Sequence, residues 1–430
     1  MSKYSSFCFD TYNFDVNSKT LTLNYSYENG PVFIETYKFD FEFINYSNEA
    51  LDRALQLLFL IAGVSYFKIF LAPSIVVKNI NINGQTSDFL NKTYQRGLGE
   101  FFYVNKLEPN YNISFPVDTK FSLNVLSIDG IGSMIGLGGG KDSLVTAELL
   151  RDRPDTYTWS LGHKSQLQPL VEATNIPHLY VERNWDKQLL DLKDDPKAYN
   201  GHIPISAIFA AVGTVVAVLS GKRDVIVSNE SSASEPNLEY KGIEINHQYS
   251  KSLEFEQDFQ KVLLSNFGDG VRYFSALRPL SEIYIAEVFS KVAFSKYKDV
   301  FSSCNRAFVN ESNSMFWCGE CPKCAFTFLV LAPFVNSPEL EKLFGGKNLL
   351  LDESLEPTYK QLLGIEGDKP LECVGEIKES RTAMQLAKTK YSELSKFQFG
   401  LPENYDYKSL SQHSMPENIF NLLKEFIINN

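Results

Sequence analysis

The sequence lacks the features that would place the chain on a nucleic acid or outside the cell. Acidic residues outnumber basic ones, 52 against 41, and the formal net charge is −11. Binding to nucleic acid over a large surface needs clustered positive charge, so no nucleic-acid partner is expected. The N-terminal residues contain no apolar core of an export signal, and the expected location is therefore the cytoplasm.

No apolar stretch has both the length and the setting of a membrane span. The stretch 57–67 ends at Lys68, well short of the ~20 residues that a spanning helix requires. The stretch 203–219 is longer, but it contains Ser206 and Gly213, and a strand-like segment follows almost at once. We therefore expect two buried helices of a globular protein and no membrane partner.

The chain also lacks a low-complexity linker, so its division into domains rests on changes of pattern. With 44% hydrophobic and 22% charged residues it has an ordinary globular composition, and 430 residues suffice for two or three domains. We predict an N-terminal α+β domain over residues 1–122, an α/β domain with a parallel sheet over residues 123–300, and a helical C-terminal region over residues 301–430.

The N-terminal region begins with the alternation of apolar and polar residues that is typical of strands. Two such runs, at 20–25 and 32–37, flank Asn29 and Gly30, a pair that favours a tight turn between paired strands. A helix is expected over about 48–70, followed by irregular sequence to about Pro116. The region shows no chemistry of its own, and we expect it to be a scaffold or a cover on the substrate side.

From about residue 122 the pattern changes to strand-length apolar runs separated by helical segments. This rhythm is typical of a parallel sheet covered by helices. The expected strands are 133–137, 156–161, 178–182 and 224–227.

Three consecutive glycines separate the strand expected at 133–137 from a helix expected at 144–151. Such a loop lets backbone amides approach an anion, and the helix N-terminus adds partial positive charge, so the expected ligand is a phosphate. The Walker pattern does not fit because Asp142 separates Lys141 from Ser143, and the dinucleotide fingerprint fails on spacing. A glycine-rich turn without a ligand is the alternative.

The loop resembles the Ser-Gly-Gly-X-Asp-Ser loop of the ATP pyrophosphatase, or adenine-nucleotide α-hydrolase, superfamily. The resemblance implies a parallel-sheet ATP pyrophosphatase domain that cleaves ATP between its α and β phosphates. Lys141 stands at the variable position and either adds charge to the anion or points to solvent. The loop residues that would bind ATP, with Asp142 holding magnesium, are Gly138 in place of the first serine, Gly139, Gly140, Lys141, Asp142 and Ser143.

Four of the six cysteines lie within 21 residues: Cys304, Cys318, Cys321 and Cys324. In a cytosolic protein this spacing favours a metal over disulfides, and four thiolates satisfy a closed, structural zinc site. Free thiols packed before a core helix and an iron–sulfur cluster are the alternatives. We expect the remaining two, Cys8 and Cys373, to be buried as small apolar side chains.

Clustered polar side chains follow the strand expected at 224–227, at the edge where ligands of parallel sheets bind. Further polar and basic residues lie in segments on either side of it, although each alone could equally satisfy the backbone. The candidate substrate-binding residues are His202, Ser228, Asn229, Ser231, Ser234, Asn246, Arg278 and Arg306, and the candidate catalytic residues are Asp142, Glu230, His247 and Lys251.

Taken together, the segments resemble the ATP-dependent UDP-N-acetylmuramoyl-L-alanyl-L-glutamate epimerases of peptidoglycan synthesis. The resemblance implies adenylation of the α-carboxylate of the terminal L-glutamate of a UDP-sugar peptide, exchange of the Cα proton, and release of AMP. ATP, magnesium and a structural zinc are the implied cofactors. The matching segments are 60–68, 138–143, 200–204, 228–234, 246–252, 316–324 and 369–376.

Several questions stay open in the sequence. Candidate bases for the Cα proton are His247, Lys251, Glu230 and His202, and the sequence does not rank them. The loop with four cysteines is also similar to the 7-cyano-7-deazaguanine synthases, which are ATP-dependent ligases. Because Gly138 replaces a serine, a zinc-bearing nucleotide-binding assembly module without catalysis is a further alternative. The sequence does not indicate the oligomeric state.

Overall fold

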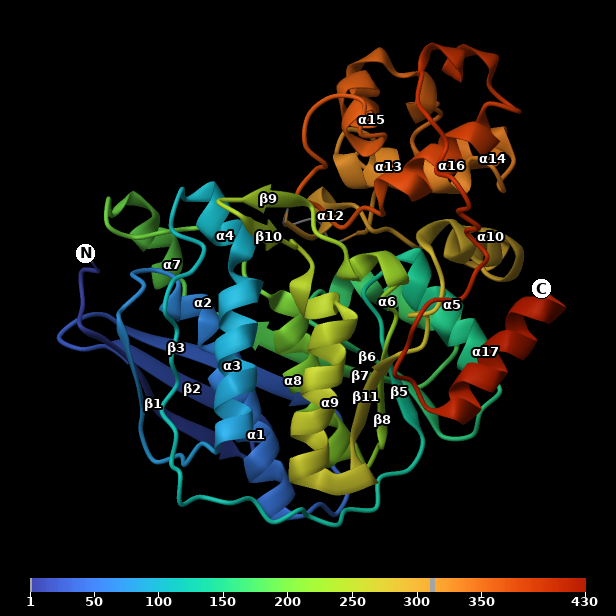
Figure 1. Ribbon diagram of the computed structural model, residues 1–430. Coiled ribbons are helices and arrows are strands. Elements are labelled where there is room, and N and C mark those ends of the chain that lie inside the picture. The colour runs from blue at the N-terminus through green and yellow to red at the C-terminus, as the bar shows by residue number, and fades with distance from the viewer. Residues whose placement is uncertain (1, 310–313) are drawn as a thin grey trace.

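The computed structural model describes residues 2–309 and 314–430, and a nine-stranded sheet runs through it (Figure 1). The order of its strands is β11-β8-β5-β6-β7-β3-β2-β1-β4, and β9 and β10 form a separate ribbon. The strands are β1 (Ser6–Asp15), β2 (Thr20–Tyr27), β3 (Val32–Asp40), β4 (Ser74–Val77), β5 (Ser133–Gly136), β6 (Thr156–Leu161), β7 (His178–Asn184), β8 (Asp224–Val227), β9 (Leu238–Tyr240), β10 (Ile243–Ile245) and β11 (Arg272–Ser275).

The half of the sheet from β11 to β7 is parallel, as the alternation of strands and helices predicts. Strands β6 and β8 have the expected bounds, and β5 and β7 differ from theirs by one or two residues. Strand β3 pairs antiparallel with β7, so the N-terminal strands continue the same sheet across the predicted boundary at residue 122. The α/β class with a mostly parallel sheet is confirmed.

The predicted N-terminal hairpin is also confirmed. Strands β2 and β3 are antiparallel, and the turn between them closes with a hydrogen bond from Gly30 N to Tyr27 O at 2.9 Å. Asn29 adopts φ of 53°, a left-handed conformation that asparagine tolerates better than most residues.

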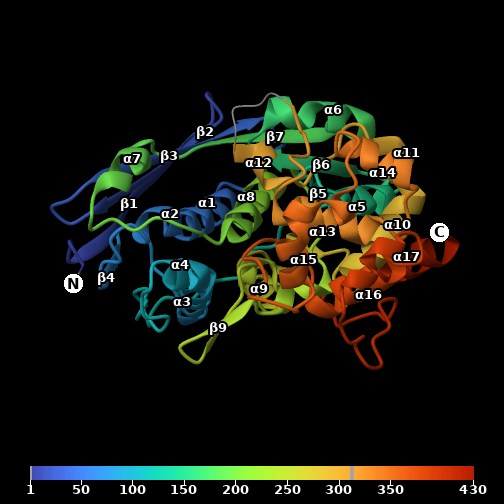
Figure 2. The ribbon, with the colours of Figure 1, turned by 90° about the horizontal axis from the view of Figure 1, so that it is seen from above.

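Helices cover both faces of the sheet (Figures 1 and 2). Alternate strand residues face two separate cores: Met134 and Val225 belong to one, and Ile135 and Ile226 belong to the other. Helices of the first core are α1 (Asn48–Ala62), α2 (Val64–Phe67), α3 (Gly84–Gly97), α4 (Gly99–Val104), α8 (Ile205–Ser220) and α9 (Leu253–Phe267). Helices of the second include α5 (Lys141–Leu150), α6 (Lys164–Thr174), α10 (Glu282–Val292) and α11 (Phe294–Tyr297), whereas α7 (Gln188–Asp191) follows β7.

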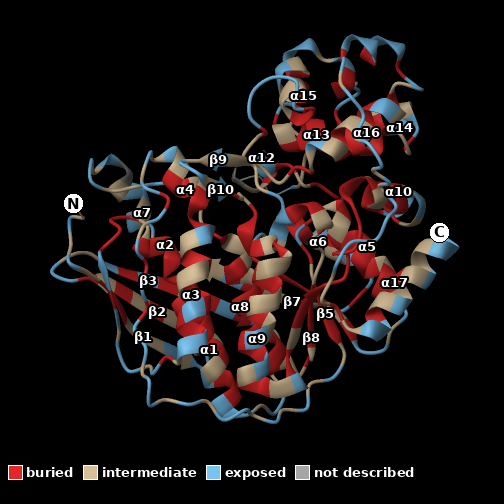
Figure 3. Ribbon diagram, viewed as in Figure 1, coloured by how far each residue is buried: buried red, intermediate tan, exposed pale blue. Residues whose placement is uncertain are grey.

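The helix expected over 48–70 is present but broken at Gly63. A Cβ on Gly63 would lie 2.3 Å from the ring of Phe9, so this residue lets the helix pack against β1. The span Asn48–Phe67 is long and apolar enough to cross a membrane, but 83% of its most apolar window is buried inside the protein (Figure 3). It is a core element, as is the buried helix α8.

The expectation of irregular sequence up to Pro116 is wrong, since this stretch contains β4, α3 and α4. Helix α3 is capped by the Asn83 side chain, which accepts from Thr86 N at 2.8 Å, and it buries Phe89 and Tyr94. The helix has few apolar residues, so the sequence signal for it is weak, and its packing against the rest of the protein stabilises it.

The C-terminal region is helical and stands over the carboxyl ends of the parallel strands (Figure 1). Helix α13 lies at its centre and packs against α10, α15 and α16. The last helix, α17, returns to the side of α5. The helices of this region are α12 (Asn305–Val309), α13 (Pro322–Leu331), α14 (Ser337–Leu343), α15 (Glu356–Leu362), α16 (Ile377–Ala387) and α17 (Glu417–Asn429).

Candidate functional site

The glycine loop lies between the carboxyl end of β5 and the N-terminus of α5, as predicted. Gly139 adopts φ of +90°, and a Cβ there would lie 3.0 Å from the carbonyl oxygen of Ser302 and from the ring of Phe308. A Cβ on Gly138 would meet nothing within 4 Å. A Cβ on Gly140 would lie 3.2 Å from Ser303 Cβ, so the surroundings are tight at the second and third glycines, and only the second also has a left-handed backbone.

Three acidic side chains meet beside this loop. Ligand atoms of Asp142, Glu230 and Glu282 all lie within 4.8 Å of one another. They come from the starts of α5 and α10 and from the loop after β8, and Glu230 and Glu282 are buried. Oxygen atoms at this separation can share one hard divalent cation such as magnesium.

Burial and mutual repulsion shift the protonation of these carboxyls. Burial, aided by Glu282, raises the pKa of Glu230 to about 7, and burial also raises the pKa of Asp142. Burial alone would raise the pKa of Glu282, but Lys141 and Lys323 hold it below its usual value. Glu282 is therefore the carboxylate of the cluster whose negative charge the protein stabilises most.

Lys141 does not point to solvent, which was one of the two predictions for it. Its ammonium is buried and donates hydrogen bonds to Asp142 Oδ1, at 2.5 Å, and to Glu282. Burial would lower the pKa of Lys141, but these two carboxylates raise it above its usual value. Lys141 is therefore protonated, and its ammonium lies between two carboxylates at the N-terminus of α5.

A pair of histidines lies beside a glutamate from the N-terminal region. Glu100, on α4, bonds to His247 Nδ1, and its carboxylate lies 3.4 Å from His202 Nδ1. Burial lowers the pKa of His202 to about 4. Burial would also lower that of His247, but Cys373 and Glu100 raise the His247 pKa to about 9. At neutral pH His247 is therefore cationic and His202 neutral, and Glu100 of the N-terminal region lies against both of these candidate residues.

Cys373 does not behave as a buried apolar side chain, in contrast to the prediction. Its Sγ accepts a hydrogen bond from Lys251 Nζ at 3.2 Å and lies 3.9 Å from His247 Nε2. The thiol is partly exposed. Cys8, in contrast, is buried on β1 as expected.

Most of the predicted serine and asparagine ligands hold the loops that carry them. Ser228 Oγ bonds to Thr146 Oγ1 at 2.7 Å, and Ser234 Oγ accepts from Leu253 N at 3.1 Å. Asn246 Nδ2 donates to a carbonyl of the loop after β8, that of Ala233, at 2.9 Å. The carbonyl of Asn229 accepts from the Ser275 hydroxyl at 2.6 Å.

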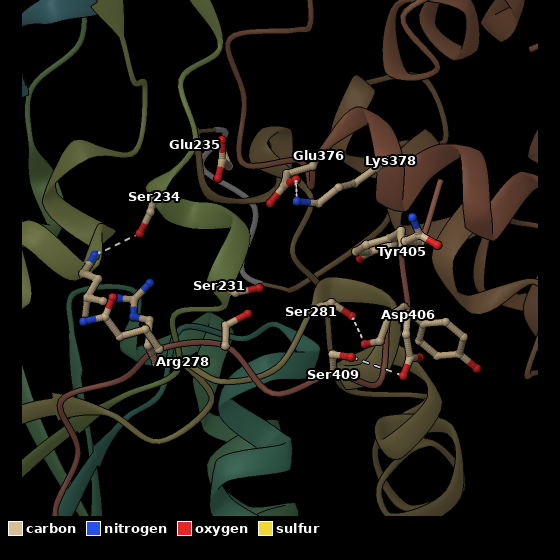
Figure 4. A pocket seen from close by; sticks show the side chains of 15 residues that line it. Ser231, Ser234, Glu235, Arg278, Ser281, Glu376, Lys378, Tyr405, Asp406 and Ser409 are labelled. Atoms are coloured by element: carbon tan, nitrogen blue, oxygen red, sulfur yellow. Dashed lines mark hydrogen bonds and ion pairs between the residues drawn. The ribbon is translucent and has the colours of Figure 1, made fainter. Parts of the chain in front are cut away.

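Ser231 and Ser234 also line a cavity of about 400 Å³ (Figure 4). Ser231 and Ser281, which line it, are the chain neighbours of Glu230 and Glu282. Arg278, which also lines it, donates to the carbonyl oxygen of Glu230, so the cavity lies next to the segments that carry these acids. The side chains around it are mainly hydroxyls and charged groups, including the ion pair of Glu376 with Lys378 (Figure 4).

The two predicted arginines have different surroundings. Arg278 is buried and donates to the carbonyl oxygens of Glu230, at 2.6 Å, and Lys251, at 2.5 Å, while pairing with Glu256. It ties together the two loops that carry these residues. Arg306 is exposed and pairs with Glu320 beside the cysteine cluster.

The four clustered cysteines converge as the spacing predicts. The Sγ atoms of Cys304, Cys318, Cys321 and Cys324 lie within 4.8 Å of one another, and all four are free thiols. This arrangement fits a tetrahedral metal ion held by four thiolates.

The cysteine cluster also contacts the segment that carries Cys373. Lys323, between two of the cysteines, donates to the carbonyl oxygen of Cys373, and Asn305, next to Cys304, donates to Glu372 at 2.7 Å. The cluster therefore holds this segment against the site.

Four residues of the site were not predicted as such: Glu100, Glu282, Lys323 and Cys373. In the sequence, Glu282 has no feature that distinguishes it from other acidic residues in the first turn of a helix, where it follows the capping residue Ser281. Glu100 lies in a stretch without a motif. The signal for Cys373 was its place in the segment 369–376, which already matched the resembling family.

Comparison with known proteins agrees with the resemblance that the sequence shows. The chain matches the family models of the MurL N-terminal domain, over residues 1–276, and the MurL C-terminal domain, over residues 300–398. No solved structure gives a significant match.

Three curated relatives are named UDP-N-acetyl-alpha-D-muramoyl-L-alanyl-L-glutamate epimerase. The relative from Xanthomonas oryzae pv. oryzae is 39% identical over 390 residues, which cover 89% of this chain and 85% of the relative. The relative from Salinispora tropica is 37% identical, and the match covers 90% of this chain and 85% of the relative. The relative from Micromonospora sp. is 39% identical, and the match covers 78% of this chain and 75% of the relative. The chain belongs to the MurL family, in agreement with the predicted resemblance to these epimerases.

Proposed function

We propose that this protein converts the terminal L-glutamate of UDP-MurNAc-L-Ala-L-Glu to D-glutamate in the synthesis of peptidoglycan precursors. The observation that carries the proposal is that a phosphate-type glycine loop, a three-carboxylate cluster and a row of proton-transfer groups share one site in a chain of this family. The reaction takes place in the cytoplasm, where the nucleotide-linked precursor is made.

The first step of the proposed reaction transfers AMP from ATP to the α-carboxylate of the glutamate. The loop residues 138–143 and the N-terminus of α5 would hold the phosphates, and Lys141 would offset their charge. Asp142, Glu230 and Glu282 fit a magnesium ion, which when bound would neutralise the departing pyrophosphate. These features support assignment to the ATP pyrophosphatase superfamily.

Adenylation explains why an epimerase would consume ATP. An ionised α-carboxylate resists loss of the Cα proton, because a second negative charge would develop beside the first. A mixed anhydride with AMP withdraws electrons instead, so the Cα–H bond becomes more acidic. Water then releases AMP, and the hydrolysis of ATP drives an epimerisation that is itself near neutral.

The remainder of the substrate would occupy the hydroxyl-lined cavity beside the acidic cluster. Its volume of about 400 Å³ falls in the range of small-molecule sites, ~300–1,000 Å³. Ser231, Ser234 and Arg278 are the predicted substrate residues that line it. Cationic His247 and Lys251 would offset the negative charge of the glutamyl peptide.

The four clustered cysteines support a structural zinc ion. Its role would be to fix the segment 369–376 through Lys323 and Asn305, since the cluster has no ligand position left for a substrate.

The proposal is tested by incubating the protein with UDP-MurNAc-L-Ala-L-Glu, ATP and magnesium in deuterated water. We expect AMP, pyrophosphate and, after acid hydrolysis, D-glutamate that carries deuterium at Cα. Formation of ADP in place of AMP would contradict the adenylation step. As a control for the ligase alternative, 7-carboxy-7-deazaguanine with ammonia should not stimulate pyrophosphate release.

A further inference from the structure

A partly exposed thiol lies in the middle of the charged groups of the site. Cys373 Sγ accepts a hydrogen bond from Lys251 Nζ at 3.2 Å, and His247 Nε2 lies 3.9 Å from it. On its other nitrogen, Nδ1, His247 is bonded to the carboxylate of Glu100. A thiol beside an imidazole that a carboxylate orients is the arrangement by which proteins activate sulfur.

The groups that face Cys373 favour its ionised form. Lys251, His247 and Lys323 are the cations around it, while Glu372 and Glu100 are the anions on the segments that pack there. Burial would raise the pKa of the thiol, but Lys251 and His247 lower it to about 5. At neutral pH the sulfur is a thiolate, which can accept a proton, whereas His247 and Lys251 already hold theirs.

Cys373 also belongs to the same charged centre as the proposed ATP site. The negative charges of Cys373, Glu230 and Asp142 all stabilise the ammonium of Lys251. A carboxylate activated at the glycine loop would therefore place its Cα close to this centre.

We propose that Cys373 is the base that removes the Cα proton of the adenylated glutamate, a role that rests on the proposed function. The Cα–H bond breaks as an S–H bond forms, and the electron pair moves into the activated carboxyl as an enolate. A proton from solvent water forms the new Cα–H bond on the opposite face. The hydroxide left by that water molecule is neutralised by the proton that Cys373 releases to solvent, which restores the thiolate and balances the step.

The test separates adenylation from proton exchange. Cys373→Ala and Cys373→Ser are compared with the wild type and with Cys8→Ala, a matched loss of a thiol far from the site. The readouts are pyrophosphate release, formation of D-glutamate and incorporation of solvent deuterium at Cα. We expect both Cys373 variants to lose epimerisation and deuterium incorporation by about 100-fold or more while they continue to release pyrophosphate. Cys8→Ala should behave as the wild type.

Several outcomes would overturn the role of Cys373. These are continued epimerisation by the variants, loss of pyrophosphate release in the same proportion as epimerisation, and a substrate acyl group attached to Cys373, which would make it a nucleophile. If the wild type itself shows no substrate-dependent pyrophosphate release, the proposed function fails instead.

A second experiment does not depend on the folding of a Cys373 variant. Iodoacetamide is applied to folded Cys8→Ala protein, and peptide mass spectrometry locates the label. Alkylation of Cys373 should stop epimerisation and spare pyrophosphate release. Epimerisation by protein that is fully labelled at Cys373 would overturn the proposal.

Discussion

The buried ammonium of Lys141 donates a hydrogen bond to the carboxylate of Glu282, which lies 141 positions further along the chain. This ion pair joins the N-terminus of α5 to that of α10, and both partners are almost without solvent contact. It therefore couples the glycine loop to the acidic cluster before any ligand binds.

Loss of the Lys141 ammonium should destabilise the protein strongly. Lys141→Met leaves Glu282 and Asp142 without their cation, and we expect the free energy of unfolding to fall by about 3–5 kcal/mol. Denaturant titration measures it. Lys291→Met, which removes the exposed cation of a half-buried ion pair on the same helix as Glu282, should change it by about 0–1 kcal/mol. Equal effects of the two substitutions would contradict the coupling described above.

The first two glycine positions of the loop should respond in opposite ways. Gly139→Ala forces a side chain into a left-handed conformation against Ser302 and Phe308, and should cost about 1–3 kcal/mol of stability together with ATP-dependent pyrophosphate release. Gly138→Ser meets open space and restores the hydroxyl of the usual loop, so it should retain pyrophosphate release. An active Gly139→Ala variant would argue against a backbone cradle for phosphate.

His247 should stabilise the protein in a pH-dependent way. Its pKa is raised to about 9 in the folded state, so its contribution is complete below about pH 6.5 and is lost as the pH rises to about 9. The difference in free energy of unfolding between the wild type and His247→Gln should therefore shrink by about 1–3 kcal/mol over this window. A difference that is constant with pH would refute a cationic His247.

His202 provides the matched control for His247, because the fold lowers the pKa of His202 and raises that of His247. Burial lowers its pKa to about 4, so the wild type loses stability as the pH falls from about 6.5 to 4. His202→Gln should remove this loss and leave the range above pH 6.5 unchanged. Titration of the two imidazoles by NMR gives an independent measurement of both pKa values.

Removal of the metal ion from the four-cysteine cluster should reduce epimerisation, although the cluster itself is not expected to contact the substrate. We expect one zinc ion per chain, and Cys321→Ser should lose it, lower the thermal midpoint and reduce epimerisation, because Lys323 and Asn305 would no longer hold the segment of Cys373. Cys8→Ser should retain the metal. Iron in place of zinc, or full activity of metal-free protein, would contradict this account.

The two predicted arginine ligands can be told apart by stability. Arg278→Met should lower the free energy of unfolding by about 3–5 kcal/mol even without substrate, since Glu256 and two carbonyl oxygens lose a buried partner. Arg306→Met should leave stability nearly unchanged, as its side chain is exposed. If Arg306 binds substrate, its loss raises KM alone.

The sequence by itself determined the elements and motifs whose signals are local. Strands β6 and β8 have the predicted bounds, the β2–β3 hairpin forms around Asn29 and Gly30, and the glycine loop and the four cysteines lie together as their spacing indicates. Each of these follows from periodicity, turn chemistry or spacing within a short stretch of chain.

Only the tertiary structure decided which side chains share the site. Glu100, Glu282 and Cys373 come from helices and segments that are far apart in sequence, and each looks ordinary beside its chain neighbours. Their chemistry arises from burial and from the charges that the fold brings to them: an ammonium beside Glu282, a carboxylate beside His247, and two cations beside the thiol of Cys373. Such pKa shifts depend on distances across the fold, which a local sequence pattern does not contain.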